Sequence, residues 1–190
     1  MFTELVTSSR STRSFKPNSP ISEDTLMELI DIARKTPAAM NLQTLKYKLI
    51  TDKEGIADML SITRWATNLA IKLPPKDHEP SAFIIICHDT RIAEERPIFM
   101  IDVGIAAQTI LLAAKERGLG GCLIGSAAGE TISATFNIAN HLAPKLVIGL
   151  GVPDEEIVLE DTTNEKTTYY RDDAGVHHVP KRALEEIIIK

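Results

Sequence analysis

The sequence predicts a single domain in which helices cover a central sheet, of either the α/β or the α+β class. The 190 residues correspond to one domain, because a domain averages about 150 residues. Apolar residues make up 44% and charged residues 25% of the chain, as in ordinary soluble globular proteins. Helix-periodic segments and short apolar runs follow one another along the chain but alternate only loosely, which leaves both classes open.

Four segments carry helix signals. Ser22 can cap a helix whose first turn is acidic and which Pro37 stops. Asp52 can cap a shorter helix that continues to residues 59–60, and residues after Arg182 form a short terminal helix. The longest helix covers residues 98–118 and ends at Gly118. Within it, Ile105–Ala114 is almost wholly apolar, so this helix must be covered on nearly all sides.

Strands are expected between these helices, at Tyr47–Ile50, Phe83–Cys87, Cys122–Ile124 and Leu146–Val152. The middle two are continuous apolar runs, which is typical of strands buried on both faces. Residues 74–80 form a loop. The acidic stretch Asp154–Glu165 is interpreted as a solvated excursion without chemistry.

Charge and composition exclude several classes of function. The net charge of −5 does not suit a nucleic-acid partner, which requires a basic face. No apolar run reaches the ~20 residues that span a membrane, and no signal peptide is visible. Cys87 and Cys122 stand in apolar stretches without metal-ligand or redox spacing, which favours a reducing, cytoplasmic setting.

Familiar catalytic motifs are missing from the sequence. The chain has no complete dinucleotide fingerprint, no Walker A loop, no zinc-protease motif and no nucleophile elbow. The pair His177-His178 has no carboxylate or cysteine at ligand spacing, so no metal site is expected. If the protein is an enzyme, a cofactor carries the chemistry and no catalytic side chain is assigned.

Three segments could bind such a cofactor, and each also has a purely structural interpretation. Arg10-Ser11-Thr12-Arg13 combines two guanidinium groups and two hydroxyls, which suits an anion, or it is surface charge. Pro37–Gln43 ends a helix with two amide side chains that can pair with a planar heterocycle, or it is a capped turn. The glycines of Gly118–Gly125 let backbone approach a flat ligand, or they make a tight helix-to-strand turn.

Together, five ordered segments resemble the FMN-dependent nitroreductase family. They are Arg10-Ser11-Thr12-Arg13-Ser14-Phe15; Pro37, Asn41 and Gln43; Asp102, Gly104, Ala106, Gln108, Leu112, Ala113 and Ala114; Gly118–Gly125; and Pro180-Lys181-Arg182. The segments span nearly the whole chain, so the resemblance implies one FMN-binding domain over residues 1–190. It also implies an α+β fold with a mixed central sheet wrapped by helices, in an intertwined homodimer with two FMN sites at the interface.

The resemblance assigns roles to individual residues. The cofactor-binding residues that it implies are Arg10, Ser11, Thr12, Arg13, Pro37, Asn41, Gln43, Leu123, Ile124, Gly125, Lys181 and Arg182. Arg10, Lys181 and Arg182 would hold the phosphate with help from Ser11, and Arg13 would lie near flavin N1 and O2. The backbone N–H of Gly125 would point toward flavin N5. The Pro37–Gln43 segment would come from the other subunit.

The chain departs from the family pattern at several positions. Ser9 stands where the first arginine is usual, Ala38 replaces a serine, and Thr44-Leu45 replaces proline–tryptophan. Residues 64–80, where the family varies in its substrate-covering helices, do not align cleanly. The last two of these departures fall in segments that border the substrate, so the resemblance does not name a single substrate.

The implied activity is a ping-pong reaction in which NADH or NADPH reduces FMN at N5 and a nitroaromatic or quinone-type acceptor takes the electrons. Other readings of the same fold are a flavin-cleaving or dehalogenating enzyme and a non-catalytic flavin-binding protein. An unrelated α/β domain with surface arginines is a further alternative.

Overall fold

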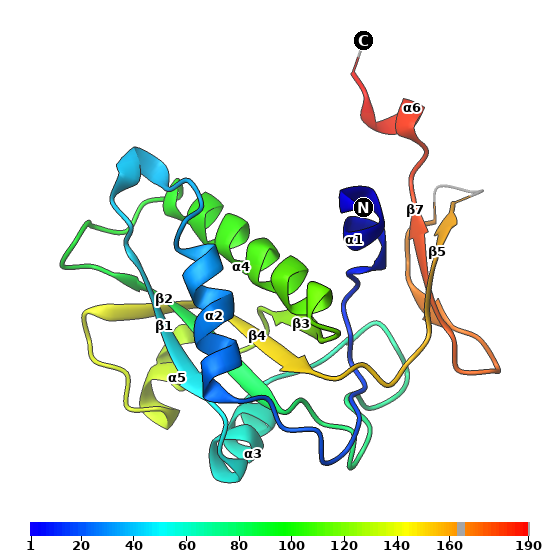
Figure 1. The fold of residues 1–190 in the computed structure, drawn as a ribbon, viewed down its shortest axis with the longest axis horizontal. Coiled ribbons are helices and arrows are strands. Elements are labelled where there is room, and N and C mark those ends of the chain that lie inside the picture. Colours follow the sequence, from blue (N-terminus) through cyan, green and yellow to red (C-terminus); the bar gives the residue numbers. More distant parts are fainter. Residues whose placement is uncertain (163–165, 190) are drawn as a thin grey trace.

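A four-stranded sheet forms the centre of the molecule in this computed structural model, which describes residues 1–162 and 166–189. The strand order is β1-β2-β4-β3, and Figure 1 shows the helices packed around this sheet. The strands are β1 (Leu45–Ile50), β2 (Ala82–Asp89), β3 (Gly120–Ile124) and β4 (Leu142–Gly151). All four expected strands are therefore present, each slightly longer than or shifted from its expected range.

The α+β class is confirmed, and the structure refines the expectation of a mixed central sheet. The pairs β1–β2, β2–β4 and β3–β4 are all antiparallel. A parallel bridge joins Ser11 to Gly121 at the outer edge of β3. The central sheet is thus antiparallel with one parallel bridge.

The helices are α1 (Phe2–Ser8), α2 (Glu23–Ala33), α3 (Lys53–Ile62), α4 (Phe99–Glu116), α5 (Gly129–Thr135) and α6 (Leu184–Ile187), with a 3₁₀ turn η1 (Ala39–Asn41). Four of the helices, α2, α3, α4 and α6, begin and end near the positions that local signals predicted, whereas α1 and α5 were not predicted. The hydroxyl of Ser22 accepts from Thr25 N, and the carboxylate of Asp52 accepts from Gly55 N. Gly118 adopts φ +75° after α4, the left-handed conformation that closes many helices.

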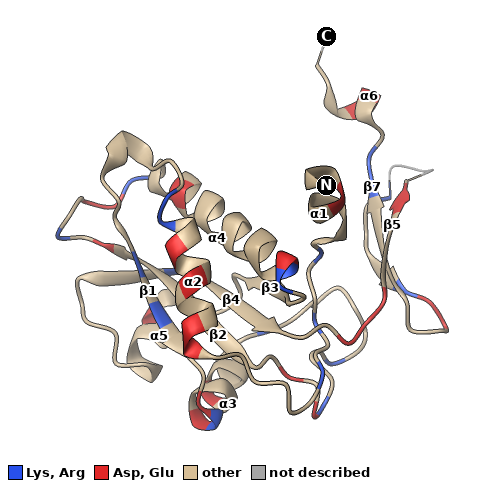
Figure 2. Ribbon diagram, in the orientation of Figure 1, with Lys and Arg blue, Asp and Glu red and all other residues tan. Residues whose placement is uncertain are grey.

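Helices cover both faces of the central sheet. On one face α2 and α4 pack against Ile84, Ile86 and Ile148. On the other face Phe83, Ile85 and neighbouring side chains pack against α3, α5 and the segment around Trp65. Successive residues of β2 thus enter different cores, and every residue of β2 is buried, as its continuous apolar sequence predicted. Figure 2 shows acidic residues along α2, of which Glu23, Asp24 and Glu28 are exposed.

A second, smaller sheet lies apart from the first, on the same side of the molecule as α1 and α6 (Figure 1). It contains β5 (Ile157–Asp161), β6 (Tyr170–Arg171) and β7 (His177–Lys181) in the order β5-β7-β6. β5 falls inside the acidic stretch Asp154–Glu165, so the expectation of a solvated excursion there was wrong. The apolar run Ile157–Leu159 pairs with β7. Residues 163–165 of that stretch lie outside the described residues.

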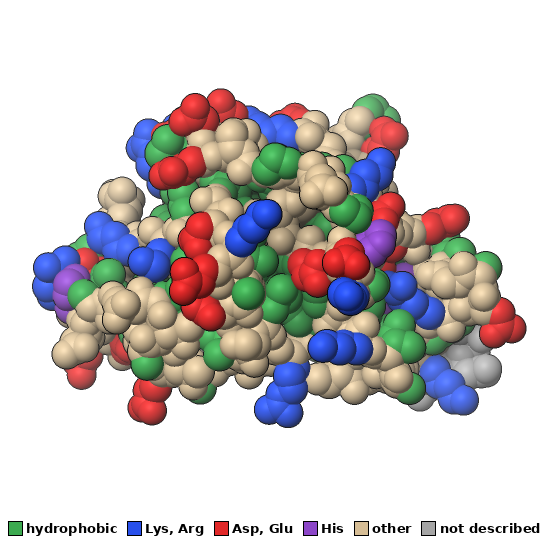
Figure 3. Space-filling view, turned by 90° about the horizontal axis from the view of Figure 1, so that it is seen from below, with side chains coloured by type: hydrophobic (Ala, Val, Ile, Leu, Met, Phe, Trp, Pro, Cys, Tyr) green, Lys and Arg blue, Asp and Glu red, His purple; other side chains and the backbone are tan. Residues whose placement is uncertain are grey.

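The surface carries charges of both signs. On the face that bears α3, Figure 3 shows basic and acidic side chains interspersed with hydrophobic ones. Among the helices of the described residues, none has the length and apolar character that a membrane span requires.

Candidate functional site

The structure brings two of the predicted segments together at the edge of β3. Ser11 forms the parallel bridge to Gly121, and Thr12 N donates to Gly121 O at 2.9 Å. A Cβ at Gly120 would lie 2.5 Å from Thr12 Oγ1, and one at Gly121 would lie 2.7 Å from Gly149 O. Close packing of the chain therefore explains these two glycines, which leave no room there for a flat ligand.

Gly125, at the end of the same turn, has a different environment. No atom lies within 4 Å of the place where its Cβ would stand, and the residue is exposed. Leu123 is 39% exposed, whereas the side chain of Ile124 packs in the core. Of the glycine turn, the backbone around Gly125 is thus open to a ligand.

Arg13 is held against the smaller sheet. Its guanidinium carbon lies 5.1 Å from the centre of the Tyr169 ring, and its Nη1 donates to Ser11 O at 3.2 Å. Nη1 also lies 3.3 Å from His177 Nε2. Because an arginine can only donate, His177 must accept through Nε2 and is neutral with its proton on Nδ1. Burial, together with the charges of Arg13 and Arg171, lowers the pKa of His177 from 6.5 to about 4.

Glu155 fixes the backbone of this arginine segment. Its side chain is 3% exposed and accepts from the backbone N–H groups of Arg13 and Ser14. It also pairs with Arg171, a residue of β6. One buried carboxylate thus connects the arginine segment to the smaller sheet.

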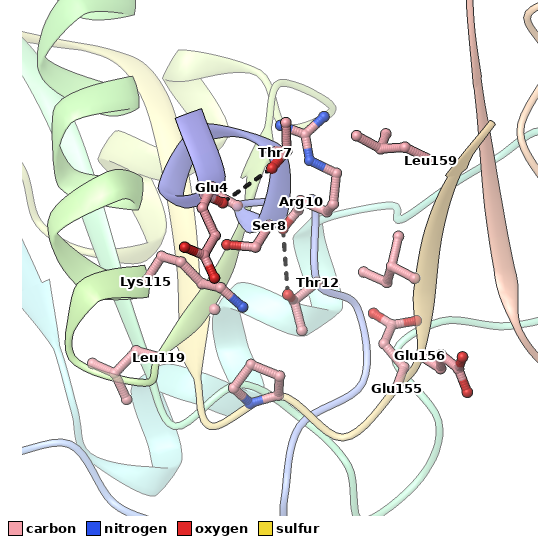
Figure 4. Close-up of a pocket in the computed structure, with 14 residues that line it drawn as sticks. Glu4, Thr7, Ser8, Arg10, Thr12, Lys115, Leu119, Glu155, Glu156 and Leu159 are labelled. Atoms are coloured by element: carbon pink, nitrogen blue, oxygen red, sulfur yellow. Dashed lines mark hydrogen bonds between the residues drawn. The ribbon is translucent and has the colours of Figure 1, made fainter. Parts of the chain in front are cut away.

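Arg10 faces a cavity of about 550 Å³ between α1, the end of α4 and β5 (Figure 4). Lys115 adds a second cation, and Thr7, Ser8 and Thr12 add hydroxyls. The carboxylates on the cavity wall are Glu4, Glu155 and Glu156. Arg10 Nη2 donates to Val6 O at 2.7 Å, and burial lowers the pKa of the guanidinium.

The Nε atoms of Arg10 and Arg13 are both buried and have no hydrogen-bond partner among the described residues. A buried donor without a partner costs about 1–3 kcal/mol, so two of them beside one strand edge indicate a place prepared for acceptor atoms. Guanidinium donors match the oxygens of phosphate and of a heterocyclic carbonyl. The donor set therefore fits FMN, which offers both kinds of oxygen.

Lys181 and Arg182 lie close to this region without lining the cavity. Lys181 is paired in register with Asp161 at the end of β7, one strand beyond β5. Both residues are exposed, and Arg182 Nη1 contacts Glu186 at 3.4 Å. Within one chain, the structure does not bring them into contact with Arg10.

The Pro37–Gln43 segment lies at the opposite end of α4. Ala39 N donates to Asp102 Oδ1 at 2.9 Å near the start of that helix, whereas Lys115 at its end faces the Arg10 cavity. The helical rise places Asp102 and Lys115 about 20 Å apart. Asn41 and Gln43 are exposed and have positive φ angles of 54° and 52°. A single chain therefore separates these amides from the arginine segment.

Sequence reasoning missed Glu155, Lys115, Tyr169 and Arg171 as parts of this region. Glu155 was placed in an acidic stretch without chemistry, and Tyr169 and Arg171 lie in a stretch that the sequence analysis did not assign. For Glu155, Tyr169 and Arg171 the available signal was the apolar run Ile157–Leu159, which is consistent with a strand. Their partners are distant in sequence, so only the tertiary structure shows the contacts.

Comparison with known proteins identifies the family. The model of the nitroreductase family matches residues 6–152 of this chain. The chain belongs to the nitroreductase family. The match ends before the smaller sheet and before Lys181 and Arg182.

Individual nitroreductase-family proteins share both sequence and fold with this member. A protein from Bacillus subtilis, provisionally named NAD(P)H nitroreductase YodC, is 24% identical over 74% of this chain and 84% of its own. A nitroreductase family protein from Streptococcus pneumoniae has a TM-score of 0.72 at 17% identity, with all of both chains covered. A provisionally named nitroreductase from Exiguobacterium sibiricum, solved in complex with FMN, has a TM-score of 0.69 at 18% identity, with 82% of this chain and 89% of the other covered.

Proposed function

We propose that this nitroreductase-family member is an FMN-dependent oxidoreductase that passes electrons from NADH or NADPH to nitroaromatic or quinone-type acceptors. The observation that carries the proposal is the pair of unpartnered Nε donors of Arg10 and Arg13 in a segment bridged to β3, the strand after which the backbone of Gly125 is open. The FMN bound to the Exiguobacterium sibiricum protein and the NAD(P)H in the name of the Bacillus subtilis protein support it. When bound, FMN supplies N5, which receives hydride from NAD(P)H and returns electrons to the acceptor in a ping-pong sequence.

The residues of this chain would hold the cofactor by charge and shape. Arg10 would bind the phosphate, with the hydroxyls of Ser11 and Thr12 beside it. Arg13 would donate to the N1–C2=O edge of the ring, where its fixed charge stabilises negative charge. The backbone of Leu123, Ile124 and Gly125 would form the wall near N5. The stacking on Tyr169 and the neutral acceptor His177 keep the Arg13 guanidinium in place before any ligand binds.

A second copy of the chain would complete the site. Ala39 contacts Asp102, which lies about 20 Å along α4 from Lys115 of the Arg10 cavity, so Asn41 and Gln43 would contact the cofactor from a partner subunit. Pro37 and the η1 turn would accompany them. Lys181, the last residue of β7, and Arg182 directly after it would add positive charge for the phosphate. We therefore propose a homodimer with two shared FMN sites, in which residues 1–190 act as one domain.

The electron acceptor would be a small molecule. We propose no nucleic-acid partner, no membrane partner and no metal. Among the described residues, no group of three metal-ligating side chains occurs. Cys87 and Cys122 are buried and unpaired, which suits the cytoplasm. Burial raises the pKa of the Cys122 thiol, so we assign this cysteine to packing.

The test is the affinity of purified protein for FMN and for riboflavin, which lacks the phosphate. Arg10→Ala should weaken FMN binding about 10-fold or more, because a charge-assisted hydrogen bond contributes about 1.5–3 kcal/mol, and should leave riboflavin binding nearly unchanged. Arg182→Ala tests the role of the C-terminal segment, since it should weaken FMN binding only if that segment reaches the site. Equal loss of both ligands in Arg10→Ala would contradict the phosphate role.

Steady oxidation of NADH or NADPH in the presence of a quinone or a nitro compound would identify a reductase. A non-catalytic flavin-binding protein would show no such oxidation. Analysis of the flavin after turnover in oxygen would show whether the ring stays intact. A cleaved flavin would assign the protein to the flavin-cleaving branch of the same fold. A protein that binds neither flavin would refute the proposed function.

A further inference from the structure

A cavity of about 680 Å³ opens between α3 and the segment from Thr63 to Glu79. Its apolar wall includes Leu60 of α3, Trp65 and Leu73, and the last two are nearly buried. Trp65 is fixed there, because its Nε1 donates to Thr63 Oγ1 at 3.2 Å and its ring meets Phe83 edge-on. The cavity therefore has a rigid aromatic floor that suits a planar ring.

Three cations stand around this cavity. Arg64, Lys72 and Lys76 line it and are exposed, and none of them forms a salt bridge with a described residue. Glu79 is the carboxylate of the lining, and its Oε1 accepts from Asp77 N at 3.2 Å. The rim thus has an excess of positive charge over an apolar floor, in a chain whose net charge is −5. Such a rim attracts an anion at the mouth of the cavity.

The cavity rim is fixed to the glycine turn. Ser126 Oγ accepts from Arg64 N at 2.8 Å and donates to Arg64 O at 2.9 Å. Ser126 directly follows Gly125, the open residue at which the proposed reaction takes place. Arg64 therefore connects the lining of the cavity to the residue that follows Gly125.

We infer that this cavity is a substrate subsite that binds an anionic group, a carboxylate or a phosphate, attached to a planar ring. Arg64, Lys72 and Lys76 contact the anion, and the apolar wall with Trp65 receives the ring. The inference rests on the proposed function for the reaction that follows binding. The anion belongs either to an electron acceptor or to the diphosphate of the nicotinamide donor, and these sources share the same recognition chemistry.

Trp65 is the single tryptophan of the chain, so its fluorescence reports directly on the cavity. The probes are 4-nitrobenzoate and 4-nitrobenzamide, which have the same ring and differ in charge. Titration of the FMN-loaded protein should quench Trp65 with a dissociation constant about 10-fold lower for the anion, as expected for contact with more than one cation. The preference should shrink as salt rises, because screening weakens contacts between exposed charges.

The variant Lys72→Gln/Lys76→Gln removes two cations from exposed positions, where substitutions seldom disturb folding. It should remove most of the preference for nitrobenzoate and leave the affinity for nitrobenzamide within 2-fold. The control Lys48→Gln removes one exposed cation from β1, outside the cavity, and should keep the preference. Arg64→Gln is a second variant, with an unchanged melting temperature as the check on folding. Equal affinities for the two probes in the wild type, or a preference that survives in Lys72→Gln/Lys76→Gln, would overturn the inference.

Half-reactions identify the source of the anion. If Lys72→Gln/Lys76→Gln is reduced more slowly than the wild type by NADH but not by the uncharged 1-benzyl-1,4-dihydronicotinamide, the subsite binds the donor. If the reduced variant is reoxidised more slowly than the wild type by nitrobenzoate but not by nitrobenzamide, the subsite binds the acceptor. Charge-dependent quenching of Trp65 without any NAD(P)H oxidation would refute the proposed function and leave the anion site in place. If the cavity variants oxidise NAD(P)H as the wild type does and no charge-dependent quenching of Trp65 occurs, the anion site is refuted and the proposed function stands.

Discussion

Glu155 joins the arginine segment to the smaller sheet through three contacts. Its carboxylate accepts from two backbone N–H groups and pairs with Arg171, whose side chain is 18% exposed. Glu155→Ala would leave a partly buried cation and two amides unpaired, so we expect a loss of about 3 kcal/mol in the free energy of unfolding. Urea denaturation measures this loss. The neighbouring Glu156→Ala, at an exposed position, serves as the control and should change stability by less than about 0.5 kcal/mol.

The adjacent residues His177 and His178 should give opposite pH dependence. His177 keeps its neutral form, with its pKa lowered from 6.5 to about 4 by burial and by Arg13 and Arg171. Because the unfolded chain binds the proton first, His177 supports stability above pH 6.5 and this contribution is lost as pH falls toward 4. His178 lies between Asp172 and Glu160, which raise its pKa. Its contribution is complete below pH 6.5 and is lost as pH rises through the raised pKa.

Unfolding free energies measured from pH 4 to 8 test this pair. His177→Gln should flatten the decline on the acid side, and His178→Gln should flatten the decline on the alkaline side. An acid-side slope that is unchanged in His177→Gln would show that other groups set it.

At the scale of elements, glycines within the strands are needed for close packing, whereas Gly125, directly after β3, has open space around it. A Cβ at Gly151, at the end of β4, would lie 2.5 Å from the buried ring of Phe15, whereas one at Gly125 would meet nothing within 4 Å. Gly151→Ala should therefore lower the free energy of unfolding by about 1–3 kcal/mol, as overpacking does. Gly125→Ala should leave stability nearly unchanged and weaken FMN binding. Thermal unfolding and flavin titration of both variants measure the two effects, and a stable Gly151→Ala protein would contradict the packing role.

At the scale of the whole molecule, one side of α4 remains uncovered in the single chain. Ile101 is 56% exposed and Met100 is 50% exposed, whereas Ala107 is fully buried. The sequence predicted cover on nearly all sides, and the chain itself supplies it on the side that faces the sheet and α2. A second copy would cover the rest, and it would bring Asn41 and Gln43 to the arginine segment.

Ile101→Glu tests this assembly, because a buried charge is strongly unfavourable. The variant should fold as a monomer with weakened FMN binding, since a ligand that binds only the dimer favours it by mass action. Sedimentation followed at the flavin absorbance measures both properties. Ala107→Glu is the contrasting variant and should unfold the chain itself. A monomeric Ile101→Glu protein with full FMN occupancy would contradict the shared site.

The sequence by itself determined the elements whose signals are local. Ser22 and Asp52 cap their helices as predicted, Gly118 ends α4, and β2 is buried on both faces. These features depend on residues within one or two turns or on the periodicity of a single segment, which the sequence contains directly. The family resemblance was also visible, because its five segments keep their order along the chain.

Only the tertiary structure decided which of these segments meet. It placed the Arg10–Arg13 segment against Gly121, connected it through Glu155 to a sheet that the sequence did not predict, and fixed Ser126 beside Arg64. It also separated Asn41 and Gln43 from the arginines by the length of α4. Each of these contacts joins residues far apart in the sequence. Such pairings depend on how whole elements pack to bury their apolar faces, and no local pattern specifies that packing.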